Sequence, residues 1–553
     1  MPFSVPPPKE IGCPIPANTP HAVSVTLPTW AANIGYEEGQ DWVVSKMNSG
    51  YPRFYIHSSV QKLCKNLEEA YGREGEKALV FPSYGVAKRC REFFKKFSSE
   101  SSRVRIVRLS TPVLENDDHV NAKVQAHIAA LFFPESEFTY AKQYWQHTGE
   151  IVSSRMAEFC LARLATDTKR TPSPPQKPVG SEEDSDKFVE ERFGRNLDLS
   201  FADEAKVALK RRISAKINET ATGSTSTSEN DVYLYPTGMN SIFSAHRAFL
   251  EARQGIEKSL KSVCYGFPYV DSLNILKKFG PGVHFYGSGD AADLDDLEKK
   301  LEAGERILML FCEFPSNPLL RSPDIRRIDQ LARKYDFGVV VDETVGNLLN
   351  VCVTPFADVV VSSLTKVFSG DSNVMGGSLV LNPSGRYYQD LKKALDNQYE
   401  DIFWAEDAIY LERNSRDIVE RNQRINENAE AVAALLKDNP LIKELYYPKY
   451  NPSKHLFDAC KTADGGYGGL LSIVFHKPEH AVKFYDAVNT AKGPSLGTNF
   501  TLTSPYTILA HYGELDYVEQ FGVSRHLVRI SVGLEEQSGL LKVFQQGLSA
   551  IDE

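Results

Sequence analysis

Residues 337 to 382 read FGVVVDETVGNLLNVCVTPFADVVVSSLTKVFSGDSNVMGGSLVLN. Three short apolar runs lie in this stretch, at 337–341, 357–361 and 378–381, and each is rich in β-branched residues and bounded by Gly, Asp or Pro. Runs of this kind are typical of strands that are buried on both faces. Because strand and helix signals alternate from 231 to 385, we predict an α/β fold with a mostly parallel central sheet.

Polar residues follow the first two of these runs. Asp342 and Thr344 come after the first, and Ser363, Thr365 and Lys366 come after the second. In an open α/β sheet, ligands bind outside the carboxyl ends of the strands. Pyridoxal phosphate (PLP) needs a lysine amine for its attachment and a carboxylate that keeps its ring nitrogen protonated. Lys366 and Asp342 fit these two roles, and the neighbouring hydroxyls can hold the phosphate.

The order of these residues resembles that of a known family. Asp-x-Thr, then Ser-x-Thr-Lys, then a segment that ends in Gly-Gly resembles the PLP-dependent enzymes of cysteine and methionine metabolism. Over roughly residues 188 to 553, the chain is most similar to the fungal-type cystathionine γ-synthases of that family. The resemblance implies the type I fold of PLP-dependent transferases (aspartate-aminotransferase-like), with a smaller α+β C-terminal domain and an N-terminal extension domain.

Length and composition fit a multidomain soluble enzyme. The chain has 553 residues, of which 42% are hydrophobic and 24% charged, so two or three domains are expected. A formal net charge of −9 argues against general nucleic-acid binding. The sequence contains no run of about 18 apolar residues, so no membrane span is predicted. The N-terminus lacks the pattern of a signal peptide. We therefore expect a cytoplasmic protein, without a metal site, because the eight cysteines form no Cys-x-x-Cys pair.

A stretch dense in Pro, Ser and charge, at 168–187, is expected to be a linker. We therefore predict an N-terminal α/β extension over 1–187, a PLP-binding major domain over 188–385 and an α+β domain over 386–553. In the extension, KALVFP and VRIVRL have strand patterns, and SSVQKLCKNLEEAYG and GVAKRCREFFKKF have helix patterns. In the last domain, a long helical run over 405–437 precedes the strand patterns LIKELYYP, GGLLSIVF and LVRISVGL.

The opening of the family occurs twice in this chain. The first occurrence begins at Tyr51-Pro52-Arg53 and runs to ALVFPSYGVA, and the second begins near 188. In the first, Ser83-Tyr84-Gly85-Val86 lacks the Gly-Met of a phosphate-binding turn. A degenerate duplication would give this pattern, and so would an insertion that separates pieces of one domain.

Thr237-Gly238-Met239 is the predicted phosphate turn, between a strand pattern and a helix pattern. Free N–H groups and the dipole at a helix N-terminus suit an anion, and glycine allows it to come close. The family has Ser-Gly-Met here, so Thr237 keeps the hydroxyl. Ser363 and Thr365 would complete the cradle. The alternative for this turn is an ordinary capped helix start. Lys366 could instead be a solvated lysine, Asp342 a helix N-cap and Thr344 a loop hydroxyl.

Two further cofactor contacts are implied by the resemblance. Tyr265, in SVCYGFPYVDSL, corresponds to the aromatic residue that lies flat on the cofactor ring and helps in proton transfer. Asn317, in Pro-Ser-Asn-Pro, corresponds to the residue that bonds the phenolic oxygen of PLP. The alternatives are a half-buried turn tyrosine and a simple Asn-Pro turn.

Arg529 lies inside the apolar run LVRISVGL. A buried guanidinium without an anion is costly, and its fork of donors suits a carboxylate. We expect it to bind the α-carboxylate of the substrate, assisted by Ser495 in PSLG. An internal salt bridge is the alternative.

The family also takes a Tyr and an Arg from a neighbouring subunit to bind the phosphate. Arg192 corresponds to that arginine, but Glu190 stands where the tyrosine is expected. Tyr51 and Arg53 keep the Tyr-x-Arg pair in the first occurrence, so either pair could serve. Phe500 stands where several relatives have an acidic residue, which leaves the reaction subtype open.

The resemblance implies a PLP-dependent transferase. Its expected reaction is a γ-replacement that joins an O-acyl-L-homoserine, acetyl or succinyl, to L-cysteine and gives L-cystathionine, with Lys366 as the base. A cystathionine lyase, an O-acylhomoserine sulfhydrylase and an inactive regulatory protein on a PLP fold are the alternatives. A homodimer or homotetramer acting on small amino acids, without nucleic acid or membrane partners, is also implied.

Overall fold

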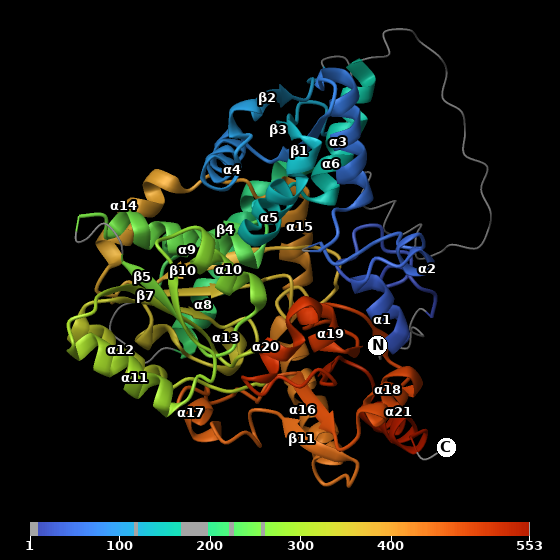
Figure 1. Cartoon of the computed structure of the whole chain (residues 1–553), viewed down its shortest axis with the longest axis vertical. Coiled ribbons are helices and arrows are strands. Elements are labelled where there is room, and N and C mark those ends of the chain that lie inside the picture. The colour runs from blue at the N-terminus through green and yellow to red at the C-terminus, as the bar shows by residue number, and fades with distance from the viewer. Residues whose placement is uncertain are drawn as a thin grey trace.

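The computed structural model describes residues 9–52, 54–114, 120–167, 197–220, 226–255 and 260–551. Within these ranges the chain forms three sheets, of three, seven and five strands in sequence order, and each is covered by its own helices (Figure 1). The three sheets lie inside the three segments that we propose as domains. The proposed boundary near residue 187 lies outside the described residues.

The seven-stranded sheet contains the stretch with which the sequence analysis began. Its strands, in spatial order, are β4 (Val232–Tyr235), β10 (Gly377–Leu381), β9 (Val359–Ser362), β8 (Gly338–Asp342), β7 (Ile307–Glu313), β5 (Lys261–Tyr265) and β6 (Val283–Tyr286). The pairs from β9 to β6 are parallel, and β10 is antiparallel to both of its neighbours. The prediction of a mostly parallel α/β sheet is confirmed.

Both faces of this sheet are buried, as the apolar runs predict. Val340, Val359 and Val361 belong to a core shared with α9 (Gly238–Ala252) and α14 (Tyr388–Gln398) on one face. Val339, Val341 and Val360 alternate with them along the strands and belong to a core shared with α11 (Ala291–Glu302) and α12 (Ile325–Tyr335) on the other face. The helices of this unit are α8 (Ala202–Thr220), α9 (Gly238–Ala252), α10 (Val270–Lys278), α11 (Ala291–Glu302), α12 (Ile325–Tyr335), α13 (Asn347–Asn350) and α14 (Tyr388–Gln398).

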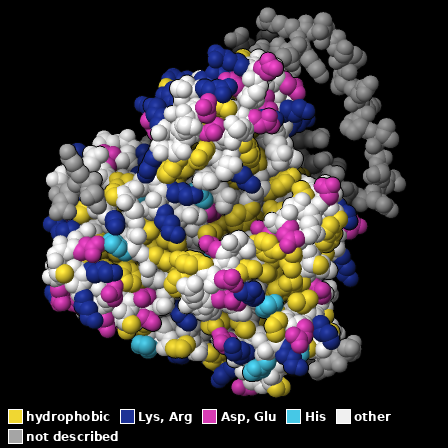
Figure 2. All heavy atoms as spheres, in the orientation of Figure 1, with side chains coloured by type: hydrophobic (Ala, Val, Ile, Leu, Met, Phe, Trp, Pro, Cys, Tyr) yellow, Lys and Arg dark blue, Asp and Glu magenta, His cyan; other side chains and the backbone are white. Residues whose placement is uncertain are grey.

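The N-terminal unit is a small antiparallel sheet with helices around it. Its strands are β1 (Glu76–Phe81), β2 (Arg105–Ser110) and β3 (His127–Pro134), in the order β1-β3-β2, and its helices are α3 (Ser58–Tyr71), α4 (Tyr84–Phe97), α5 (Phe138–Thr148) and α6 (Ser154–Asp167). The two strand patterns and two helix patterns predicted here lie at β1, β2, α3 and α4. This unit sits on top of the major domain in Figure 1, and Figure 2 shows hydrophobic side chains gathered along the seam below it.

A carboxylate occupies the N-terminus of α4, where the first family-like opening lacks a phosphate turn. Ser83 caps the helix, and its hydroxyl donates at 2.6 Å to Glu400, which follows α14 (Tyr388–Gln398). Arg89 donates to the same carboxylate at 2.8 Å. A Cβ added to Gly85 would come within 2.1 Å of a Glu400 oxygen. The anion that this turn binds is therefore part of the protein, and it joins the N-terminal unit to the segment after α14.

Glu400→Gln is expected to lower the free energy of unfolding by about 1–3 kcal/mol, because it removes the charge that Arg89 and the α4 N-terminus share. Chemical denaturation at neutral pH measures this loss. Glu92→Gln is the matched control, since Glu92 pairs with Lys95 on the exposed face of the same helix and is expected to change stability by less than about 0.5 kcal/mol. Equal effects of the two substitutions would contradict the assignment.

The C-terminal unit has the strand order β11 (Ile442–Tyr446), β12 (Leu470–Phe475), β15 (Val528–Ser531), β14 (Leu502–Ser504) and β13 (Ala491–Lys492). Its helices are α16 (Ile418–Lys437), α17 (Lys454–Asp458), α18 (Pro478–Ala487), α19 (Tyr506–His511), α20 (Leu515–Glu519) and α21 (Gln537–Ser549). The single long helical run predicted over 405–437 is wrong: α15 (Ala405–Asn414) ends before α16 begins. The hydroxyl of Ser415 donates to the carbonyls of Leu411 and Glu412, and so competes for helix bonds.

Residues 9–52 and 54–57 precede the N-terminal unit and are here called the N-terminal arm. The arm contains α1 (Trp30–Glu37) and α2 (Asp41–Val44) and lies against the C-terminal unit, near α18, α19 and α21 (Figure 1). Its apolar residues Val25, Leu27, Val43 and Met47 pack with Leu509 of α19. Among the described residues, no helix is both long enough and apolar enough to cross a bilayer.

Candidate active site

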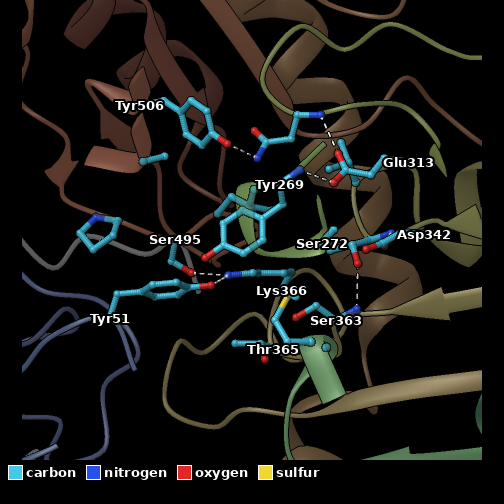
Figure 3. A pocket seen from close by; sticks show the side chains of 18 of the residues that line it. Tyr51, Tyr269, Ser272, Glu313, Asp342, Ser363, Thr365, Lys366, Ser495 and Tyr506 are labelled. Carbon is cyan, nitrogen blue, oxygen red and sulfur yellow. Dashed lines mark hydrogen bonds between the residues drawn. The ribbon is translucent and has the colours of Figure 1, made fainter. Parts of the chain in front are cut away.

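The carboxyl ends of β7, β8 and β9 open into one cavity at the junction of the major domain, the C-terminal unit and the arm (Figure 3). Twelve of the fifteen residues that the sequence analysis considered for the site line it: Tyr51, Thr237, Gly238, Met239, Asn317, Asp342, Thr344, Ser363, Thr365, Lys366, Ser495 and Arg529. Tyr265 does not line it, and Arg53 and Arg192 lie outside the described residues.

Lys366 follows β9 in a turn closed by its own N–H, which donates to the carbonyl of Ser363. Its side chain is only 7% exposed and ends in the cavity. The amine lies 3.0 Å from the Ser495 hydroxyl and 3.0 Å from the Tyr51 hydroxyl. A buried amine without a carboxylate partner in these contacts suits covalent attachment of an aldehyde.

Asp342 ends β8, next to Glu313 at the end of β7. Its carboxylate accepts the N–H of Thr344 at 2.9 Å, and the Thr344 hydroxyl accepts the N–H of Ser363 at 2.8 Å. Burial raises the pKa of Asp342. A cation in the cavity, such as the protonated ring nitrogen of PLP, would reverse this shift and keep the carboxylate charged.

The predicted phosphate turn is a helix N-terminus. Thr237 caps α9 by accepting the N–H of Asn240 at 3.1 Å, and its hydroxyl donates to the carbonyl of Gly149 at 3.0 Å. A Cβ on Gly238 would lie 2.5 Å from that of Ser363, so only glycine lets the turn approach the β9 loop. The N-terminus of a 15-residue helix and the Ser363 hydroxyl thus form a cradle that suits phosphate.

The placement of Tyr265 contradicts its predicted stacking role. Tyr265 is the last residue of β5, and its hydroxyl donates to the carbonyl of Asp290 at 2.8 Å, away from the cavity. Tyr269 lines the cavity instead, four residues further on and directly before α10. The reason is that Tyr265 belongs to the buried strand pattern SVCY, whereas the chain reaches the cavity only after the turn at Gly266, whose φ is +84°.

Asn317 and Arg529 lie together on the far side of the cavity. Arg529 donates to the Asn317 side-chain oxygen at 3.1 Å and to the Ser495 carbonyl at 2.6 Å. It is 5% exposed, and its Nε atom has no hydrogen-bond partner among the described residues. Both of these acceptors are neutral, so the internal salt bridge that we considered for Arg529 is not formed in these contacts. A substrate carboxylate would satisfy this guanidinium.

Among the further residues that line the cavity, Tyr506, Glu313 and Phe54 were not selected by the sequence analysis. Tyr506 in α19 accepts from the Asn317 amide at 3.3 Å and lies under the Arg529 guanidinium, whose carbon is 4.5 Å from the ring centroid. Glu313 accepts the backbone N–H groups of Tyr269 at 2.6 Å and Asn317 at 3.1 Å. Phe54 comes from the arm. Of these three residues, only Glu313 has a sequence pattern that indicates its position. It ends an apolar strand, as Asp342 does, and the two strands are neighbours in the sheet.

Phe500 is not part of the cavity lining. It packs beside a small core of Ile15, Ala491 and Leu502, between the arm and the C-terminal unit. Its side chain therefore packs where the arm meets the C-terminal unit, outside the cavity lining. Glu190, the other departure, lies outside the described residues.

The buried carboxyl groups beside Asp342 make the stability of the cofactor-free protein depend on pH. Burial, with the charge of Asp342, raises the pKa of Glu343 from 4.5 to about 8. An acid whose pKa is raised by folding stabilises the protein while it is protonated, so the free energy of unfolding falls as pH rises from about 4.5 to about 8. The thermal midpoint should fall across this window. In Glu343→Gln the fall in the free energy of unfolding should be less steep, by up to about 1.4 kcal/mol per pH unit.

Calorimetry of the cofactor-free protein between pH 5 and 8.5 would measure the dependence. Glu420→Gln is the control, because Glu420 is exposed on α16. An identical slope in Glu343→Gln and the unmodified protein would refute the assignment.

Comparison with known proteins agrees with this geometry. The sequence model of one family, the Cys/Met metabolism PLP-dependent enzymes, matches residues 219–549. This range contains every strand of the two larger sheets. The chain belongs to this family. Residues 59–153 match a second model, described as the N-terminal domain of fungal trans-sulfuration enzymes. The resemblance inferred from Asp342, Lys366 and the glycines is confirmed, and with it the dependence of the family on PLP.

Relatives within the family are similar over their whole length. A cystathionine gamma-synthase of Neurospora crassa is 47% identical over 99% of both chains. A cystathionine gamma-synthase of Saccharomyces cerevisiae is 42% identical over 98% of this chain and 99% of its own. The solved cystathionine gamma synthase of Xanthomonas oryzae pv. oryzae is 24% identical, with a TM-score of 0.53 over 69% of this chain and 93% of its own. That structure confirms the fold.

Proposed function

We propose that this enzyme joins an O-acyl-L-homoserine to L-cysteine by γ-replacement and forms L-cystathionine. The observation that carries the proposal is the cavity that unites Lys366, Asp342 and Arg529 in a chain whose full-length relatives, 47% and 42% identical, are named cystathionine gamma-synthases. This is a PLP-dependent transferase activity in transsulfuration and methionine biosynthesis.

The residues of the cavity divide into those that would hold the cofactor and those that would hold the substrate. Asp342 would pair with the ring nitrogen of PLP, and Asn317 with its phenolic oxygen. The α9 N-terminus at 237–239, with Ser363 and Thr365, would hold the phosphate. When bound, PLP accepts the negative charge that develops on the substrate.

The remaining groups act on the amino acid. Arg529 binds its α-carboxylate, held in place by Asn317 and Ser495. The Lys366 amine removes the proton from Cα and moves protons between the substrate carbons as the acyl group leaves Cγ and the cysteine sulfur takes its place. Apolar and aromatic side chains, among them Phe54, Met375 and Leu509, line the cavity and limit the access of water that would compete with cysteine.

A donor-by-nucleophile panel tests this proposal. O-acetyl- and O-succinyl-L-homoserine are each offered with cysteine or sulfide, cystathionine is offered alone, and products are identified by mass spectrometry. Cystathionine formed from a donor and cysteine is expected. Faster release of 2-oxobutyrate or pyruvate from cystathionine would indicate a lyase. Faster use of sulfide than of cysteine would indicate a sulfhydrylase. If added PLP gave no absorbance band, the chain would be an inactive protein on this fold.

We extend the proposal to the setting in which the enzyme works, namely the cytoplasm, as a homodimer or homotetramer. The resemblance to the family supports the assembly. Light scattering of the purified full-length chain tests the assembly. A mass of 61.8 kDa, which is the mass of a single chain, would contradict it.

A further inference from the structure

We propose that the N-terminal unit holds the phosphate end of the cofactor site, and that Glu150 acts there as a positioning residue for the turn at 237–239. The proposal rests on the proposed function and deepens it, because it gives this unit a part in binding PLP. The contact that carries it is a buried hydrogen bond of 3.0 Å from the Thr237 hydroxyl to the Gly149 carbonyl. It joins the turn that would hold phosphate to the loop between α5 and α6.

The Thr237 hydroxyl is fully used by this contact and by its own helix. It donates its single proton to Gly149, and its oxygen accepts the Asn240 N–H at 3.1 Å. A phosphate dianion only accepts hydrogen bonds, so this hydroxyl has no proton left for it. Thr237 therefore fixes the direction of the first turn of α9, and the N–H groups of that turn, with the Ser363 hydroxyl, serve the phosphate.

Gly149 is held in place by the helix that it ends. It is the C-cap of α5, its φ is +64°, and its N–H donates to the Trp145 carbonyl at 3.3 Å. Glycine adopts this left-handed conformation without strain. The position of the Gly149 carbonyl, and with it that of the Thr237 hydroxyl, therefore depends on where α5 lies.

Glu150 ties the same loop to α4. It is 2% exposed, and its carboxylate accepts two hydrogen bonds from the Arg89 guanidinium and one from the Tyr144 hydroxyl. A buried carboxylate that is paired in this way resists displacement, because movement would leave charge unpaired. The loop is thus fixed by Arg89 through Glu150, while the preceding residue, Gly149, contacts Thr237.

The helices around this loop are packed so that a shift of the N-terminal unit would reach the turn. α5 lies against α9 and α10 (Figure 1). The Tyr144 ring meets the rings of Phe243 in α9 and Phe279 after α10 edge-on, at centroid distances of 6.4 and 5.9 Å. Phe93 of α4 contacts the same ring at 5.8 Å. Close-packed interiors of this kind transmit displacements.

A comparison of PLP with pyridoxal, which lacks the phosphate, tests the proposal without any substrate. Both aldehydes would meet Lys366 and Asp342, so the ratio of their dissociation constants reports on the phosphate end alone. The constants are measured by absorbance titration of the full-length, cofactor-free protein. The variant is Glu150→Gln. The matched control is Glu76→Gln, because the Glu76 carboxylate pairs with Arg105 inside the same unit, at the start of β1.

In Glu150→Gln, PLP is expected to bind about 5- to 30-fold more weakly, while the affinity for pyridoxal changes by less than about twofold. Glu76→Gln should leave both affinities unchanged, even where it lowers the thermal midpoint as much. Tyr144→Phe is a second, milder variant, because it removes one hydrogen bond to Glu150 and leaves no charge unpaired. Its expected loss is about 2- to 5-fold, for PLP only.

Equal losses for PLP and pyridoxal would mean that Glu150 only stabilises the fold, and would overturn the proposal. An unchanged ratio in Tyr144→Phe would overturn it too, and this variant decides alone if Glu150→Gln does not fold. A selective loss of PLP affinity in Glu76→Gln would be equally damaging. Failure of the proposed function looks different: the unmodified protein would bind PLP and form no cystathionine, and the ratios in the variants would still decide the role of Glu150.

Discussion

Lys366→Ala is expected to lower kcat at least about 10⁴-fold, which is the upper range of what a positioned base contributes. Lys366 is the only lysine among the described residues that line the cavity. The two hydroxyls that contact its amine, those of Tyr51 and Ser495, lie in separate loops. No nearby side chain of the described part can replace it at the Cα proton. Steady-state kinetics with a donor and cysteine would measure the loss, and an added small primary amine should restore a minor part of the rate.

Borohydride reduction in the presence of PLP gives an independent measurement. The reduced cofactor should be found by peptide mapping on Lys366 in the unmodified enzyme and be absent in Lys366→Ala. Lys334→Ala is the matched control, since Lys334 is exposed on α12 and pairs with Glu298. A label on another lysine in the unmodified enzyme would remove the basis of the proposed function.

The core of the site was predictable because it is local in the sequence. Asp342, Ser363 and Lys366 each follow a β-branched run, and buried parallel strands bring their carboxyl ends to one edge. The glycine at 238 was predictable for a similar reason, because a phosphate turn needs a strand, a small residue and a helix in that order. Such patterns are set by a few consecutive residues.

Other members of the site depend on where distant segments pack. Tyr506 reaches the cavity from α19, and no local pattern near it indicates this, whereas Tyr51 lies in the Tyr-x-Arg pair that the sequence analysis considered for the site. The confusion of Tyr265 with Tyr269 has a different cause. Motif similarity at Tyr265 was stronger, but a residue that belongs to a buried strand has its direction fixed by the alternation of that strand. Glu313 was overlooked because a carboxylate that accepts two backbone N–H groups carries no motif of its own.

Arg529→Ala is expected to lower kcat/KM about 10³-fold, and mainly through KM. Its guanidinium is buried, burial lowers its pKa, and it donates hydrogen bonds to the neutral oxygens of Asn317 and Ser495. A buried charge of this kind is satisfied by an incoming carboxylate, and loss of one member of such a pair costs about 2–5 kcal/mol, of which 4 kcal/mol corresponds to about 10³-fold. Arg529→Lys should be intermediate, because a single ammonium cannot reproduce the two-pronged contact with a carboxylate.

The ligand itself supplies the sharpest control for Arg529. Binding to the PLP-loaded enzyme is compared for an unreactive amino acid, such as L-norleucine, and for the matching amine that lacks the carboxylate, pentylamine. In the unmodified enzyme the amino acid should bind much more tightly, and in Arg529→Ala this preference should shrink by about the same 10³-fold while amine binding stays nearly constant. A preference that survived the substitution would mean that the carboxylate is bound elsewhere. In that case the direction of the substrate in the cavity, and with it the access of Lys366 to Cα, would have to be reversed.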